Sequence, residues 1–304
     1  MIRYLKHNEI DKTKWDNCID HSMNTLIYAY SWYLDVVCPN WNALVENDYK
    51  SVMPLTAGKK YGIEYLYPPY FAQQLGVFSR ENLLQEKVLE FLNEIPSQYK
   101  FAEIYLNTKN TFEFLNFQTK KNVNIELDLN FSYEVLHKKF SDDTKRNIKK
   151  TEKHKVSLKK NISPPEIISI FRKNIGKKIS NLNDENYKTL LKLINTCIEK
   201  GFAETWGAFT KEGKLCAGVV WLIKDSRAIF LFSATNAEAK NNGGMFFLIN
   251  KFIQQHAGKK MILDFEGSNL PGLRRFYNGF GSKENVYLLI RKNNLPKLVR
   301  WFKK

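Results

Sequence analysis

The stretch KKMILDFEGSNLPGLRRFYNGFGSKE, residues 259–284, combines an apolar strand, acidic side chains and a short helix. Residues 261–265 read as a buried strand. Asp264 and Glu266 stand at its carboxyl end and are expected on one face, because strand side chains alternate with a period of two. In an open α/β sheet, ligands bind outside the carboxyl ends of strands. We therefore expect the chemistry of the protein at this strand end.

A short helix is predicted directly after the strand end. Leu270, Leu273 and Tyr277 recur at helical spacing, so one helix face should carry a phenol. Gly279 and Gly281 predict the end of the helix, after which the chain can enter a new strand.

The phenol and the two carboxylates suit transfer of an acyl group to an amine. Such a reaction needs a neutral nucleophile, a group that stabilises the oxyanion and an acid for the leaving group. Tyr277 is the candidate acid, and Glu266 or Asp264 the candidate base or amine-orienting carboxylate. Two structural alternatives stay open: the Tyr277 ring only packs, and Asp264 only caps the next helix.

Length and composition indicate a globular protein of two domains. The chain has 304 residues, of which 43% are hydrophobic, and this length exceeds the usual limit for one hydrophobic core. No apolar run reaches the length of a membrane span, and the first residues lack the apolar segment of a secretory signal, so we expect a cytoplasmic protein. The cysteines lack CxxC spacing and no two histidines are four residues apart, so we expect buried thiols and no metal site.

Positive charge is concentrated in two segments. The formal net charge is +16, and residues 131–180 hold 14 basic residues against 5 acidic ones. Residues 291–304 add 6 basic residues and no acidic one. Such fields suit a polyanionic ligand such as tRNA or a nucleotide-linked precursor, although charge runs are often only solvated surface. The oligomeric state stays open.

The order of predicted elements occurs twice. Strand meanders begin at Trp41 and again at Trp206, and each is followed by an amphipathic helix, a strand and a closing strand. Residues match at offsets of 162 to 165, including Phe114 with Phe276, which places Leu115 opposite Tyr277. We expect two α/β domains, 1–130 and 131–304, each a mixed sheet flanked by helices, with the second domain catalytic.

Basic helices connect and close the repeats. Ser141 is expected to cap a helix that carries Lys145, Arg146 and Lys149. The C-terminal residues 294–304 read as a short basic helix that could pack on the first domain.

These segments resemble a known group of enzymes. DDTKRNIKKTEKHKVSL (142–158) and DFEGSNLPGLRRFYNGFGSKE (264–284) are similar to conserved blocks of the FemABX-like aminoacyltransferases, which consist of tandem GNAT (acyl-CoA N-acyltransferase) domains and include peptidoglycan-bridge and methicillin-resistance proteins. SWYL (31–34) and YLYPPYFAQQLGVF (65–78) look like their ligand-facing segments. The resemblance implies an acyl- or aminoacyltransferase with no permanently bound cofactor and with acyl-CoA or aminoacyl-tRNA as co-substrate. The substrate-binding residues that it implies are Trp32, Tyr67, Tyr70, Lys145, Arg146, Lys149 and Arg275.

The sequence departs from ordinary acetyl-CoA GNAT domains at the phosphate-binding loop. Lys240, Gly243 and Gly244 stand where that loop would bind the cofactor, but Met245 replaces a small residue that would let the phosphate approach. Tyr277 likewise replaces a lysine common in the FemABX-like ending. Two alternatives stay open: an acyl-CoA-dependent N-acetyltransferase acting on a small molecule, and a non-enzymatic nucleic-acid-binding module that uses the basic connector.

Overall fold

The chain folds into two compact units in the computed structural model. The structure describes residues 1–296 apart from 111, 114–116, 175, 177–181 and 268. Unit 1 comprises Met1–Asn122 and Val286–Lys304, and unit 2 comprises Val123–Asn285. This division differs from the boundary expected near residue 130, because the last described strand belongs to unit 1. The expected helix at 294–304 lies mostly outside the described residues. Leu115, the expected repeat partner of Tyr277, lies wholly outside them.

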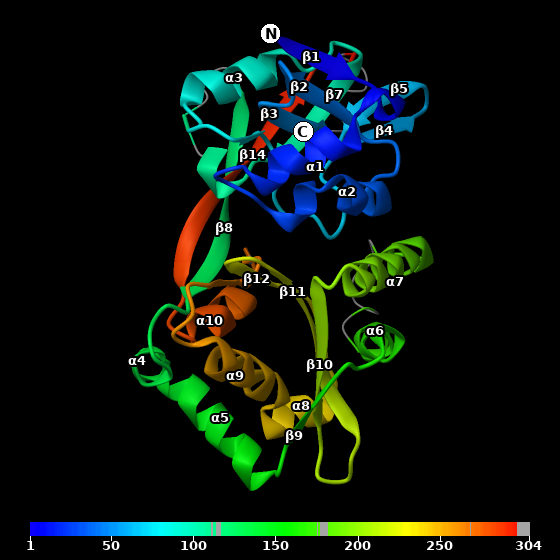
Figure 1. The fold of residues 1–304 in the computed structure, drawn as a ribbon. Helices are drawn as coiled ribbons and strands as arrows, with labels where there is room; N and C mark the ends of the chain where they lie inside the picture. Colours follow the sequence, from blue (N-terminus) through cyan, green and yellow to red (C-terminus); the bar gives the residue numbers. More distant parts are fainter. Residues whose placement is uncertain (111, 114–116, 175, 177–181, 268, 297–304) are drawn as a thin grey trace. The chain divides into compact units, whose positions relative to one another are not determined.

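Unit 1 holds two sets of strands with helices packed on them (Figure 1). Its strand orders are β1-β2-β3-β6 and β4-β5-β7-β14. The strands are β1 (Ile2–Leu5), β2 (Asn42–Glu46), β3 (Ser51–Leu55), β4 (Ala57–Lys60), β5 (Ile63–Leu66), β6 (Phe78–Ser79), β7 (Tyr99–Tyr105) and β14 (Lys283–Asn293), of which β14 begins in unit 2. The α-helices are α1 (Lys12–Asp20), α2 (Ser31–Val37) and α3 (Gln85–Asn93).

The core of unit 1 forms where α3 covers the sheet. Val88 and Phe91 of α3 pack with Leu44 and Met53, all of them fully buried or nearly so. The spacing of Val88, Phe91 and Leu92 puts them on one helical face, and alternation along β2 and β3 turns Leu44 and Met53 toward it. The amphipathic helix expected after the first strand meander is therefore confirmed as α3.

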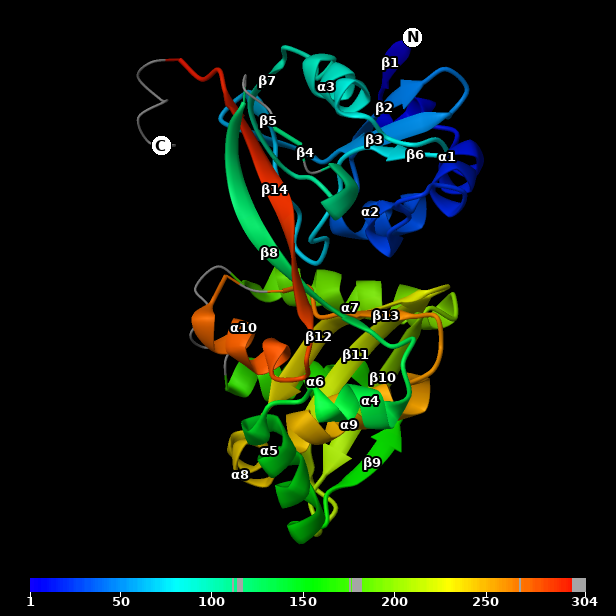
Figure 2. The same cartoon turned by 90° about the vertical axis from the view of Figure 1, so that its left-hand side faces the viewer.

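Unit 2 is a six-stranded mixed sheet covered by helices on both faces (Figure 2). Its strand order is β8-β13-β12-β11-β10-β9. The strands are β8 (Gln118–Asp128), β9 (Ser157–Lys160), β10 (Ala203–Phe209), β11 (Leu215–Lys224), β12 (Arg227–Thr235) and β13 (Ile262–Asp264), of which β8 begins in unit 1. The helices are α4 (Tyr133–Lys138), α5 (Asp142–Lys153), α6 (Pro164–Lys173), α7 (Asp184–Glu199), α8 (Ala237–Asn242), α9 (Gly244–His256) and α10 (Pro271–Asn278).

Aromatic side chains fill the core of unit 2. Phe252 of α9 stacks on Trp221 at a centroid distance of 4.1 Å and lies 5.5 Å from Trp206. On the other face of the sheet, Ile167 of α6 lies directly over Gly218. Large apolar rings on one face and a close helix contact on the other explain why β11 is apolar along almost its whole length.

The two units repeat one pattern of strand pairing. β1, β2 and β3 pair antiparallel in unit 1, as do β9, β10 and β11 in unit 2, while β5 with β7 and β12 with β13 are parallel pairs. β7 then pairs antiparallel with β14, and β13 with β8. Each unit therefore takes one strand from the other half of the sequence. These pairings support the proposal of an internal duplication.

Burial along α10 is uneven. Leu270 and Leu273 are 65% and 44% exposed, whereas Tyr277 is 8% exposed. Only the last turn of α10 therefore reaches the core.

Other expectations agree with the structure. Ser141 caps α5, because its hydroxyl accepts from the backbone amide of Thr144. Cys18, Cys38, Cys197 and Cys216 are buried and unpaired with one another. Within the described residues, no helix is both long and apolar enough to cross a membrane.

His256 makes the stability of unit 2 depend on pH. Its ring stacks on Phe252, and neither ring nitrogen has a hydrogen-bond partner among the described residues. Burial, with Lys259 nearby, lowers the pKa of His256 to about 4. Because the unfolded chain binds this proton more readily, stability is lost as the pH falls below the ordinary histidine pKa of about 6.5.

We expect His256→Phe to weaken this pH dependence. Between pH 7 and pH 5 the loss of unfolding free energy should be smaller in the variant by roughly 1–2 kcal/mol. Denaturant unfolding at both pH values measures the difference. Equal losses in the variant and the wild-type protein would contradict this role of His256.

Candidate functional site

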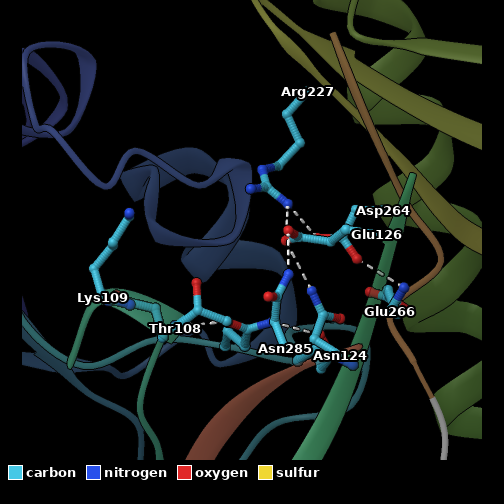
Figure 3. Close-up of polar contacts among 11 residues, drawn as sticks. Thr108, Lys109, Asn124, Glu126, Arg227, Asp264, Glu266 and Asn285 are labelled. Atoms are coloured by element: carbon cyan, nitrogen blue, oxygen red, sulfur yellow. Dashed lines mark hydrogen bonds and ion pairs between the residues drawn. The ribbon is translucent and has the colours of Figure 1, made fainter. Parts of the chain in front are cut away.

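The candidate site lies at the carboxyl end of β13, within unit 2 (Figure 3). β13 is short, and its last residue, Asp264, is placed between two neighbouring strands. The residue pairs are Ile229 of β12 with Asp264 and Asp264 with Glu126 of β8. The first residue of β12, Arg227, extends its side chain to both carboxylates. The strand ladder thus brings together charges that are far apart in the sequence.

Arg227 links the two carboxylates through one nitrogen. Its Nη1 atom lies 2.6 Å from Oδ2 of Asp264 and 2.7 Å from Oε1 of Glu126. Asn285 donates to Oε2 of Glu126 at 2.6 Å, and Asn124 donates to Oε1 at 3.1 Å. We call these five residues the arginine cluster. Its polar groups are held on strands β8, β12, β13 and β14, so their positions are fixed by the sheet.

Burial differs among the charged members of the arginine cluster. The Asp264 side chain is 1% exposed, whereas those of Glu126 and Arg227 are 16% and 26% exposed. Burial raises the pKa of Asp264, and the charge of Arg227 opposes this rise. Burial alone would lower the pKa of Arg227, but the charges of Asp264 and Glu126 raise it above its usual value. The close approach of Arg227 to Asp264 thus offsets part of the cost of burying that carboxylate.

Glu266 leaves the strand on a tight turn. Its φ is +57°, and its backbone amide donates to Oδ1 of Asp264 at 2.8 Å. At Gly267, φ is +62° and a Cβ atom would lie 2.1 Å from the carbonyl oxygen of Val123, so only glycine fits. The expectation that Asp264 and Glu266 alternate along one strand face was therefore wrong. The turn, and not the strand pleat, sets the direction of Glu266.

Tyr277 lies beside this turn, in the last turn of α10. Its ring stacks on Phe265 at 4.9 Å and meets Phe230 edge-on at 5.9 Å. Burial, and secondarily the charge of Glu266, raises the pKa of the Tyr277 phenol. The phenol therefore keeps its proton at neutral pH and can serve as a hydrogen-bond or proton donor.

The backbone next to Phe230 is irregular. Val220 pairs with Phe232 and Trp221 with Phe230, so Leu231 is an extra residue in β12. Such a bulge turns backbone groups away from the regular ladder, and bulges often occur beside active sites. A carboxylate turn, a phenol and a strand bulge thus surround one strand end.

The expected cofactor loop is occupied by protein. Gly243 ends α8 in the left-handed conformation and Gly244 begins α9. A Cβ atom on Gly243 would lie 2.5 Å from the carbonyl oxygen of Asn147, so α5 packs directly on this point. The Asn242 side chain accepts from the Gly244 amide at 2.9 Å, and Lys240 is exposed on α8. The start of α9 is thus bonded and covered by the chain itself.

The other residues predicted in unit 2 lie on and around α5 and α10. Arg146 pairs with Asp143, Lys145 donates to the carbonyl of Lys138 at 3.2 Å, and Lys149 is exposed. Arg275 lines a pocket of about 640 Å³ between the start of α5 and α10. The remaining residues that line this pocket are Ser141, Asp143, Thr144, Phe246, Gly272, Phe276, Asn278 and Gly279.

The predicted aromatic residues belong to unit 1. Trp32 lies on α2, 5.9 Å from the ring of Tyr30 and 5.7 Å from that of Tyr33. The hydroxyl of Tyr67 lies 3.8 Å from the thiol of Cys38. Tyr70 is 47% exposed. Their expected role in substrate binding stays a prediction.

Sequence reasoning missed Arg227, Glu126, Asn124 and Asn285. One signal was present in β8, where Asn122, Asn124 and Glu126 alternate with the apolar residues Val123, Ile125 and Leu127. Such alternation places polar groups on one face. No comparable signal marks Arg227, which follows a surface turn and contacts residues far away in the sequence.

The arginine cluster predicts coupled effects on stability. Arg227→Leu should lower the unfolding free energy by about 2–4 kcal/mol, because it leaves the buried Asp264 without its counter-charge. Asp264→Asn in the same chain should recover a large part of that loss. A double-mutant cycle by denaturant unfolding measures the coupling, and strictly additive effects would contradict the ion pair.

Comparisons with known proteins identify the fold. No protein-family model matches the sequence, and no curated protein matches it. Among solved structures, FemX superposes with a TM-score of 0.66 at 11% identity, over 99% of this chain and 100% of FemX. L-PGS from Bacillus licheniformis gives 0.56 at 13% identity, over 96% and 95% of the two chains. A conserved protein from Bacteroides thetaiotaomicron gives 0.56 at 12% identity, over 96% and 100%. The chain thus has the mixed α/β fold of FemX and L-PGS, which confirms the predicted fold class.

Proposed function

We propose that the protein is an aminoacyltransferase that transfers an acyl group from aminoacyl-tRNA to an amine, and that unit 2 carries the reaction. The observation that carries the proposal is the strand end where Glu266, on a turn held by Asp264, lies near the phenol of Tyr277. The fold shared with FemX supports a transferase of this type. A phenol and a partly exposed carboxylate beside a buried ion cluster provide the acid and the base that such a transfer needs.

The corresponding strand end of unit 1 differs, because its nearest ion pair, Glu103 with Arg291, lies inside β7 and β14 and not at the last residue of β7. There, β7 pairs Tyr105 with Leu289, where unit 2 pairs Asp264 with Glu126. Beyond Tyr105 come the buried amides of Asn107 and Asn110, which bond to backbone and to each other. This difference supports unit 2 as the catalytic half.

Each group has a role that follows from its position. Glu266 takes a proton from the acceptor ammonium, so that the neutral amine attacks the carbonyl carbon of the aminoacyl ester. The C–N bond forms and the C–O bond to the ribose breaks; Tyr277 donates its proton to the leaving oxygen and takes up the second proton that the attacking nitrogen loses, so the phenol is restored. Asp264, anchored by Arg227, holds the turn that bears Glu266. A backbone amide at the β12 bulge is the candidate donor to the oxyanion.

The covered start of α9 favours tRNA over acyl-CoA as the donor. Acetyl-CoA enzymes of the GNAT fold bind pyrophosphate at this helix start through free backbone amides. Here Asn147 and Asn242 occupy that position. The exposed side chains of Lys149, Lys150 and Lys153 on α5 instead offer cations to a phosphate backbone.

Tyr277→Phe tests the role of the phenol. The variant should fold, since the ring contacts are kept, but its single-turnover rate should fall by a factor of ~10² to 10⁴. Tyr133→Phe is the matched control, because its hydroxyl bonds Asn250 at 2.9 Å elsewhere in unit 2. A full rate in Tyr277→Phe would make Tyr277 a packing residue and leave catalysis to Glu266.

Charge reversal on α5 tests the donor site. The double variant Lys149→Glu/Lys150→Glu should weaken tRNA binding. It should also make the slope of log K against log salt shallower by roughly one for each lysine that no longer neutralises a phosphate. Lys188→Glu/Lys192→Glu, on the exposed side of α7, is the matched control. Filter binding across a salt series measures both, and equal affinities and slopes in the two double variants would remove α5 from the tRNA surface.

A further inference from the structure

Unit 1 contains a second polar pocket, which the proposed reaction does not use. Its volume is about 590 Å³, within the range of small-molecule sites. It lies at the ends of strands β1, β2, β4, β5 and β7, where β5 and β7 begin. The residues that carry the argument are Tyr4, Asn42, Lys59, Glu64, Gln98 and Tyr99.

A directed chain of hydrogen bonds forms the floor of this pocket. The backbone amide of His7 donates to Oδ1 of Asn42 at 3.0 Å, which fixes the orientation of the amide. Nδ2 of Asn42 then donates to the Tyr99 hydroxyl at 2.8 Å. The Tyr99 hydroxyl lies 3.1 Å from that of Tyr4, and Tyr99 is 3% exposed. Either hydroxyl of this pair can donate; we assign Tyr99 as the donor, because its buried hydrogen has no other acceptor among the described residues.

A second amide converges on the same oxygen. Nε2 of Gln98 donates to Glu64 at 3.0 Å and also lies 3.4 Å from the Tyr4 hydroxyl. The Tyr4 oxygen therefore accepts from Tyr99 and from Gln98, which uses both of its lone pairs. Its own hydrogen is left to point into the pocket. Burial, followed by the hydrogen bond to Tyr4, raises the pKa of Tyr99, consistent with Tyr99 as the donor of that pair.

The charged side chains that line the pocket determine which kind of ligand the Tyr4 hydroxyl can bind. Lys6 and Lys59 line it with exposed side chains, and Glu64 is the acidic residue among the residues that line it. Two ammonium groups against one carboxylate leave a single positive charge. A monoanion balances this charge, whereas a dianion would be repelled by Glu64.

We propose that this pocket of unit 1 binds a small molecule through its carboxylate group, which accepts the hydrogen of Tyr4 and lies near Lys6 and Lys59. The proposal does not depend on the transfer reaction of unit 2. It predicts a ligand that combines one carboxylate with a polar, uncharged body, since amide and phenol groups form the rest of the wall.

Ligand titration of the full chain, with tyrosine labelled by ¹³C at the ring carbon that bears the hydroxyl, tests the proposal. N-acetylglycine should shift the Tyr4 and Tyr99 resonances saturably. Neutral N-acetylglycinamide and methyl phosphate should bind much more weakly. Tyr4→Phe should weaken N-acetylglycine binding by about tenfold or more, because a hydrogen bond to a charged group is removed. Lys59→Gln, which leaves the hydrogen-bond chain intact, should also weaken it.

The control variant is Tyr61→Phe, since Tyr61 is 91% exposed and outside the pocket. Thermal unfolding of each variant verifies that unit 1 is folded. Unchanged affinity in both Tyr4→Phe and Lys59→Gln would overturn the proposal. So would equal binding of the neutral amide, stronger binding of methyl phosphate, or no saturable shift with N-acetylglycine.

Discussion

The ion pairs of Arg227 with Asp264 and Glu126 are the interaction on which the candidate site depends. A buried carboxylate is costly unless a counter-charge and hydrogen bonds compensate its desolvation. Here the compensating groups lie on three adjacent strands. The ion pairs of Arg227 therefore depend on the strand order β8-β13-β12, and this order in turn needs Arg227 to balance the two carboxylates. Because β8 enters unit 2 from the first half of the sequence, the cluster joins residues from both halves of the sequence within unit 2.

This constraint explains the shape of the strand end. Asp264 is held by Arg227 and also accepts the backbone amide of Glu266, which stabilises a left-handed residue at the turn. Gly267 then follows where a side chain would collide with the neighbouring strand. The fixed carboxylate of Asp264 thus maintains the strained turn. This turn places Glu266 beside the phenol of Tyr277.

Local signals in the sequence predicted much of this, and long-range contacts account for the rest. The Ser141 cap, the helix that starts at Pro271 and the strand end at Asp264 each follow from a few neighbouring residues. The pairing of Arg227 with Glu126 joins residues 101 positions apart, and no local pattern marks it. Likewise, the glycines of α8 and α9 suggested a phosphate loop, but only the fold reveals that the carbonyl of Asn147 occupies the space above Gly243.

We propose that unit 2 is a transferase that uses a charged tRNA and does not bind acyl-CoA at the start of α9. The most direct measurement supplies the wild-type chain with radiolabelled aminoacyl-tRNA or with acetyl-CoA, in the presence of a panel of primary amines, and follows formation of the amide product. We expect product from aminoacyl-tRNA and none from acetyl-CoA. Product from acetyl-CoA alone, or faster transfer from acetyl-CoA than from aminoacyl-tRNA, would contradict this assignment.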